Sequence, residues 1–198
     1  IGPSTLSTII AHLQSTYCES IGVEYMYIRN IEKKEWIKEG LHQNQNHPNF
    51  SPAQKKDILN KLNQAVSFES FLHTKYVGQK RFSLEGGESL IPALDALVLA
   101  ADALGVEEFI MGMAHRGRLN TLTNIFGKSP KDIFSEFDGK DYDEIVFDGD
   151  VKYHMGWTAK IDPNNDGRKI NINLAPNPSH LETVGAVVEG ITLSLIHI

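Results

Sequence analysis

The sequence predicts an α/β fold preceded by a helical segment, and three observations support this prediction. Apolar residues recur at helical spacing along residues 89–104, which indicates an amphipathic helix. The apolar run within residues 108–113 then predicts a buried strand, and residues 170–175 alternate apolar and polar side chains as a second strand does. A helix followed by a strand is the alternation typical of a parallel sheet with helices on its faces.

Composition places the chain among globular proteins. Its 198 residues are 41% hydrophobic and 22% charged, which is enough for one core of good size or two small ones. A formal net charge of -6 argues against a nucleic-acid partner. The single cysteine, Cys18, excludes an internal disulfide and fits a reducing compartment. No apolar run approaches the roughly 18 residues that a membrane span needs, and the start shows no signal-peptide pattern.

The first 70 residues read as a helical lead-in. Ser4 or Thr5 is expected to cap a first helix, and residues 23–28 form either a short strand or an extended lead into the next helix. That second helix is expected over residues 31–40, with Trp36 and Ile37 in the core and Gly40 as its stop. We place the domain division between a lead-in of residues 1–70 and the truncated first part of an α/β domain, residues 71–198.

A loop rich in Asn, Gln and His, residues 42–50, separates the second helix from a third. Ser51 is expected to cap that third helix, with Pro52 at its first position. His42 and His47 within the loop have no third metal ligand nearby, so a metal site there is disfavoured.

The stretch 112–120 is the strongest candidate for chemistry. It places His115 beside Arg116 and Arg118, directly after the predicted strand and before apolar residues at helical spacing. In open α/β sheets ligands bind where strands end, and a helix N-terminus offers free N–H groups to anions. We therefore expect this cluster to bind an anionic ligand.

Other segments carry weaker signals. Gly86 and Gly87 precede the amphipathic helix, an arrangement that can hold phosphate but more often only turns the chain. His154 lies in a predicted loop between glycines and beside a lysine, which raises its weight as a catalytic residue. Ser179, His180 and Glu182 invite a hydrolase interpretation, but residues so close in one chain rarely reach triad geometry and no nucleophile-elbow motif accompanies them.

Four segments, in order and spacing, resemble the thiamine-diphosphate-dependent 2-oxoglutarate dehydrogenases, the first components of their multienzyme complexes. These segments are residues 80–86, 112–120, 149–154 and 177–182, and the resemblance covers nearly the whole chain. It implies a transketolase-like fold of parallel α/β domains in a homodimer. It also implies oxidative decarboxylation of 2-oxoglutarate in the tricarboxylic acid cycle, with succinyl transfer to the lipoyl group of a succinyltransferase that works beside a dihydrolipoyl dehydrogenase.

The resemblance also implies roles for particular residues. His115 and His154 match the family's active-site histidines, which bind substrate and assist proton transfer. Arg116 matches an arginine that contacts cofactor and substrate, while Ser179 and Leu181 match positions lining the cofactor, with Ser179 also facing the substrate. Two substrate carboxylates and a diphosphate require cationic and N–H donors, and an imidazole can move protons near neutral pH.

The magnesium that accompanies thiamine diphosphate is expected to find its ligands downstream of residue 198, so no metal ligand is assigned here. Gly149, Asp150 and Asn177 imitate the spacing of that site, but they belong to the histidine-containing segments.

Alternatives remain open at this point. A 2-oxoadipate dehydrogenase shares these motifs, and the polypeptide as given could be a non-catalytic α/β piece. We expect a fragment of a longer enzyme, inactive alone, from a bacterial cytoplasm or a mitochondrial matrix. Residues 193–198 depart from the charged continuation expected of the family, and His197 is given no role.

Overall fold

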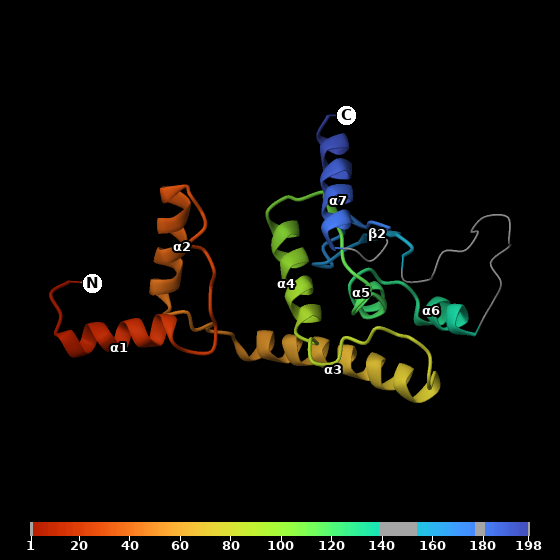
Figure 1. The fold of residues 1–198 in the computed structure, drawn as a ribbon, viewed down its shortest axis with the longest axis horizontal. Helices are drawn as coiled ribbons and strands as arrows, with labels where there is room; N and C mark the ends of the chain where they lie inside the picture. Colours follow the sequence, from red (N-terminus) through yellow and green to blue (C-terminus); the bar gives the residue numbers. More distant parts are fainter. Residues whose placement is uncertain (1, 139–153, 177–180, 198) are drawn as a thin grey trace. The chain divides into compact units, whose positions relative to one another are not determined.

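The structure is a computed structural model that describes residues 2–138, 154–176 and 181–197 (Figure 1). These residues form seven α-helices and one three-stranded sheet, so the predicted mixed α/β class is confirmed. The chain divides into two compact units, residues 1–55 and residues 56–198. The sheet and the predicted site segments all belong to the second unit.

The first unit holds helices α1, Leu6–Tyr17, and α2, Ile31–Gln43. Thr5 caps α1, since its Oγ1 accepts a hydrogen bond of 3.3 Å from the N–H of Thr8. A hydrogen-bonded pair of histidines ties the two helices together. The Nε2 of His12 lies 2.8 Å from the Nδ1 of His42, whose Nε2 lies 2.9 Å from the Tyr17 hydroxyl.

Three expectations for the first unit need correction. Helix α2 runs through Gly40 to Gln43, because a glycine within a helix costs only about 1 kcal/mol relative to alanine. Trp36 is 76% exposed and is not a core residue. Residues 23–28 form no strand, and they are not extended throughout, because Met26 and Tyr27 lie in a turn closed by a 3.1 Å hydrogen bond from the Ile28 N–H to the Tyr25 carbonyl. His47 bonds to Ser15, and His42 bonds to His12 and Tyr17, all on α1. Among the described residues, the two histidines belong to no group of three side chains that could hold a metal ion.

The long helix α3, Pro52–Lys75, carries the chain into the second unit. Ser51 caps it as predicted, accepting a hydrogen bond from the N–H of Gln54 at 3.3 Å. Its buried face is Ala65, Phe68, Glu69 and Leu72, which is helical spacing with one carboxylate on the apolar stripe. Helix α4, Leu90–Ala103, follows and leads directly to the first strand.

The sheet has the order β1-β3-β2, with β1 at Glu108–Met111, β2 at Trp157–Ile161 and β3 at Ile170–Leu174. Strands β1 and β3 are parallel, pairing Glu108 with Asn171 and Met111 with Leu174, so the expected parallel sheet is borne out for this pair of strands only. Strand β2 is antiparallel to β3 and was not predicted. Parallel pairing places the carboxyl ends of β1 and β3 at one edge, and β2 starts at that same edge.

The remaining helices are α5, Arg118–Asn124, α6, Pro130–Phe137, and α7, Leu181–Ile196. Between α5 and α6 the chain turns at Gly127, which adopts a left-handed φ of 67°. Ser129 caps α6 by accepting a hydrogen bond from the N–H of Lys131, and Pro130 is the first residue of the helix. The apolar stretch of residues 191–196 is the last part of α7.

The core of the second unit is continuous from α3 through α5 and α6 to the sheet. Its central buried side chains are Leu72, Ile91, Leu119, Phe126, Ile133, Ile170, Ile172 and Leu174. Among the helices within the described part of the chain, none combines the length and the apolar character needed to cross a membrane.

A glycine at the end of β1 sets how closely α7 approaches the sheet. A Cβ built on Gly112 would lie 2.7 Å from the Cγ2 atoms of both Val184 and Val188. Because β-branched side chains are stiff, the helix itself must move to admit a methyl group. We expect Gly112→Ala to lower the free energy of unfolding by about 1–3 kcal/mol, measured by urea denaturation.

Gly185 is the matched control for this prediction. It lies in α7, and a Cβ built on it would meet nothing within 4 Å. Gly185→Ala should therefore raise stability, by about 0.5–1 kcal/mol. Equal effects of the two substitutions would contradict close packing at Gly112.

Candidate active-site segment

The predicted histidine cluster lies on a tight turn between β1 and α5. Gly117 makes this turn possible with a left-handed φ of 74°, and its N–H donates a 2.9 Å hydrogen bond to the carbonyl of Phe82. A Cβ on Gly117 would come within 2.5 Å of Leu84 Cδ1. The turn therefore rests directly on the segment of residues 82–84.

Contacts along that segment support the two ligand candidates. The ring of Phe82 lies against the imidazole of His115, with centroids 3.9 Å apart. The Nη1 of Arg116 donates a 3.1 Å hydrogen bond to the carbonyl of Ser83. Phe82 itself has a φ of 44°, an unusual backbone for an aromatic residue, and such outliers persist where the surroundings enforce them.

A buried carboxylate holds the segment of residues 81–84 in place. Glu69 on α3 is 3% exposed, and its Oε1 accepts hydrogen bonds from the Leu84 N–H at 3.1 Å and from Asn120 Nδ2 at 3.0 Å. Its Oε2 pairs with Arg81 Nη1 at 3.3 Å. One side chain thus joins α3, residues 81–84 and α5, and a buried charge paired in this way is stable only with all partners present.

His115 is half-buried, and its surroundings favour the neutral imidazole. Burial lowers the pKa of His115 below its usual value, and the nearby charges of Arg116 and His154 lower it further. The effect of His154 on His115 means that this residue, at the start of the segment leading into β2, lies within electrostatic range of His115, although the two come from segments far apart in the sequence.

Curated relatives match nearly the whole chain, whereas no protein-family model does. The chain is 50% identical over 186 residues, 94% of its length, to the 2-oxoglutarate dehydrogenase E1 component of Cupriavidus necator. It is 48% and 47% identical, over 189 residues each, to proteins of the same name from Brucella anthropi and Brucella canis. The chain matches an N-terminal part of the 2-oxoglutarate dehydrogenase E1 component. It spans 19% of the length of these relatives.

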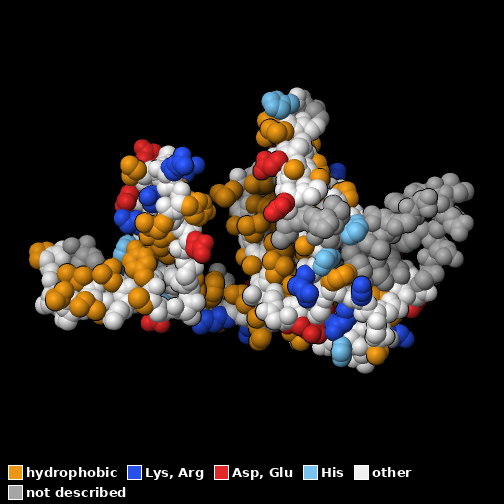
Figure 2. All heavy atoms as spheres, in the orientation of Figure 1, with side chains coloured by type: hydrophobic (Ala, Val, Ile, Leu, Met, Phe, Trp, Pro, Cys, Tyr) orange, Lys and Arg blue, Asp and Glu red, His pale blue; other side chains and the backbone are white. Residues whose placement is uncertain are grey.

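Within this E1-like segment, the two arginines beside His115 have different surroundings. Arg116 is exposed and makes one hydrogen bond among the described residues, so its guanidinium can take an anion. Arg118 is 0% exposed and cannot reach a ligand. Figure 2 shows histidine and basic side chains gathered on one face of residues 56–198. This face has the donors that a diphosphate or a carboxylate requires.

The structure describes only some of the other predicted site residues. Ser179 lies outside the described residues, as do residues 149–153 and the rejected Asp150 and Asn177 pair. Leu181 is the first residue of α7, but its side chain is outside the described set. His154 is half-buried immediately ahead of β2. Their assigned roles in an E1 active centre stay predictions.

The described residues also bear on the cofactor's metal. Within residues 2–138, 154–176 and 181–197, no three His, Cys, Asp or Glu side chains gather in a way that could hold a metal ion. The exposed guanidinium of Arg116 beside His115 favours anionic groups over a divalent cation.

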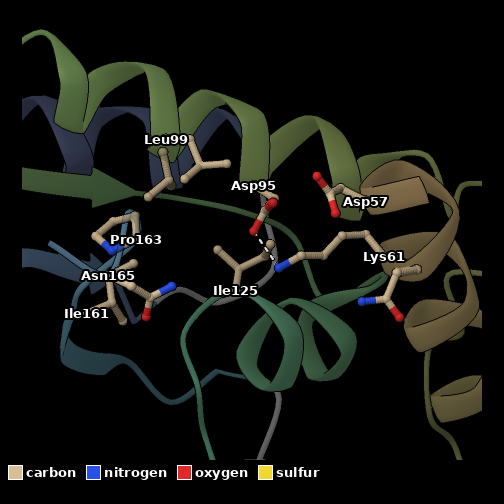
Figure 3. A pocket seen from close by; sticks show the side chains of 10 residues that line it. Asp57, Lys61, Asp95, Leu99, Ile125, Ile161, Pro163 and Asn165 are labelled. Atoms are coloured by element: carbon tan, nitrogen blue, oxygen red, sulfur yellow. Dashed lines mark hydrogen bonds and ion pairs between the residues drawn. The ribbon is translucent and has the colours of Figure 1, made fainter. Parts of the chain in front are cut away.

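A separate cleft of about 380 Å³ lies between α3, α4 and the β2–β3 turn (Figure 3). Lys61 from α3 and Asp95 from α4 form an ion pair across it, while Asp57 stands nearby. No predicted site residue lines this cleft. Its apolar side consists of Val98, Leu99, Ile125, Ile161 and Pro163.

Sequence reasoning missed the residues that support the site. Glu69 gave a usable signal, because a carboxylate on the apolar stripe of a helix must find a buried partner. Asn120 gave a similar signal inside the histidine motif. The contact of Phe82 with His115 gave no such signal, because no sequence pattern links the two segments that it joins.

The electrostatic environment of His115 leads to a pH prediction. Arg116→Gln removes a neighbouring positive charge that disfavours the imidazolium, so the pKa of His115 should rise toward its ordinary value. Titration of the His115 ring by NMR measures this change. Added salt should raise the pKa in the same direction, because it screens the exposed guanidinium.

Lys75→Gln provides the control, because Lys75 is exposed at the end of α3 and is not among the charges acting on His115. A rise of equal size in both variants would mean that net charge, rather than Arg116, sets the pKa.

Proposed function

We propose that this chain supplies part of the active centre of a 2-oxoglutarate dehydrogenase E1 component. Such an enzyme oxidatively decarboxylates 2-oxoglutarate with thiamine diphosphate, in the tricarboxylic acid cycle. The observation that carries this proposal is the meeting of His115, Arg116 and His154 at the carboxyl end of β1. The 50% identity to a protein of that name over 94% of the chain supports it.

The chemistry of these side chains fits the substrate. 2-Oxoglutarate carries two carboxylates, and Arg116 offers an exposed cation beside a half-buried imidazole. A neutral His115 can donate or accept a proton at one ring nitrogen while the other is held, as general acid–base catalysis requires. Thiamine diphosphate, when bound, supplies the electron sink for decarboxylation, and the protein supplies orientation and charge complementarity.

The remaining assignments follow from the same proposal. Arg116 and Ser179 would bind cofactor and substrate, and Leu181 would line the cofactor. The parallel pairing of β1 with β3 supports a transketolase-like arrangement, with magnesium held by residues outside this chain. The full enzyme would be a homodimer working with dihydrolipoyl succinyltransferase and dihydrolipoyl dehydrogenase. Bacterial relatives favour the cytoplasm as its compartment.

A segment exchange tests the proposal. This chain replaces the matching segment of the Cupriavidus necator E1 component, and decarboxylation of 2-oxoglutarate is followed with an artificial electron acceptor. We expect the exchanged enzyme to turn over and His115→Ala within it to lose about 10²–10⁴-fold, the scale that general acid–base catalysis supplies. The chain alone, with magnesium and thiamine diphosphate, should show no turnover.

His47→Ala is a suitable control, since His47 is exposed in the first unit and its side chain bonds only to Ser15 among the described residues. Unchanged turnover in the His115→Ala enzyme would remove His115 from the mechanism. Equal losses in both variants would point to instability of the exchanged segment.

A further inference from the structure

Arg118 is the most deeply buried charged side chain near the candidate site. It begins α5, is 0% exposed, and donates hydrogen bonds to three main-chain carbonyls. Its Nη1 donates to Met113 O at 3.2 Å, and its Nη2 donates to Met155 O at 2.7 Å and to Ala175 O at 2.9 Å. No proposed role in binding or catalysis uses this residue.

The three carbonyls belong to the three segments that carry the proposed site residues. Met113 lies two residues before His115, and Met155 directly follows His154. Ala175 follows β3, where the chain continues toward Ser179. We propose that Arg118 is a positioning residue that clamps these segments together and so fixes the separation of His115 and His154. The inference rests on the proposed function for the importance of that separation.

The chemistry of the guanidinium suits this task. Arginine presents five N–H donors in a rigid plane, so one side chain can reach carbonyls from three directions. A lysine ammonium is a compact charge on a flexible stem and cannot span the same acceptors. Burial disfavours the cation and lowers the pKa of Arg118 to about 10, which still leaves it charged at neutral pH. The carbonyl dipoles compensate for the lost hydration.

The separation of the histidines has a direct observable. The charge of His154 is one of the causes that lower the pKa of His115, so the pKa of His115 depends on its distance from His154. Coulomb coupling falls with distance, so it reports whether the two segments are held together. A residue that merely stabilised the core would not alter this coupling in the folded protein.

The experiment is an NMR titration of His115 in four versions of this chain. These are the parent sequence, His154→Gln, Arg118→Met and the double variant. In the parent background, His154→Gln should raise the titration midpoint of His115. In the Arg118→Met background, the same substitution should leave the midpoint unchanged, because the segments are no longer clamped. A full upward shift in folded Arg118→Met would overturn the proposal.

Asn120→Ala is the matched control. Asn120 is equally buried in α5, but it bonds to Ala65, Glu69 and Asn124 and touches none of the three clamped carbonyls. The coupling should survive in this variant, and its loss there would show that general destabilisation explains the result. If Arg118→Met does not fold, the same titrations are made with Arg118→Lys. Undiminished coupling between His154 and His115 in that variant would overturn the proposal.

The outcome is independent of turnover. The titration needs neither cofactor nor substrate, so an inactive segment exchange would remove the proposed function and leave the clamp measurable. Intact coupling without Arg118 would remove the clamp and leave the proposed function standing.

Discussion

The arrangement of the candidate site depends on the buried carboxylate of Glu69. Its two oxygens bind three partners from two stretches of chain: the main chain of Leu84 and the guanidinium of Arg81 from residues 81–84, and the amide of Asn120 from α5. A buried carboxylate must satisfy its oxygens, and removing one partner of a buried pair costs about 3–5 kcal/mol. The positions of residues 81–84 and of α5 are therefore linked, and the His115 turn lies between them.

The site is therefore held in place by hydrogen bonds between buried polar groups and not by apolar packing alone. Leu119 and Leu122 fill the core beside α5, while Asn120 and Arg118 carry directional hydrogen bonds to neighbouring segments. Apolar packing tolerates small shifts, but hydrogen bonds to buried groups fix both distance and angle. Directional hydrogen bonds beside an apolar core suit a site in which an imidazole must keep its orientation.

Sequence patterns predicted the helices α3 and α4, the strands β1 and β3, and the position of His115 at a strand-to-helix turn. These features depend on local spacing, which sequence displays directly. The roles of Arg116 and Arg118 could not be separated in the same way. The two arginines differ in burial only because Gly117 reverses the chain between them, and that reversal appears only in three dimensions. Strand β2 was not predicted. It pairs antiparallel with β3, and it follows a segment with no clear sequence pattern.

The parallel pairing of β1 and β3 also sets an order of events during folding. Glu108 meets Asn171 only after a long loop has closed, whereas α3 and α4 form from contacts close in sequence. Loop-closure entropy must be overcome before such distant pairs contribute, so topologies of this kind fold slowly. The helices would form early, whereas the contact of Glu69 with Asn120, which spans 51 residues, and the approach of the two histidines depend on distant parts of the chain and follow later. The helices therefore form before any of the chemistry is assembled.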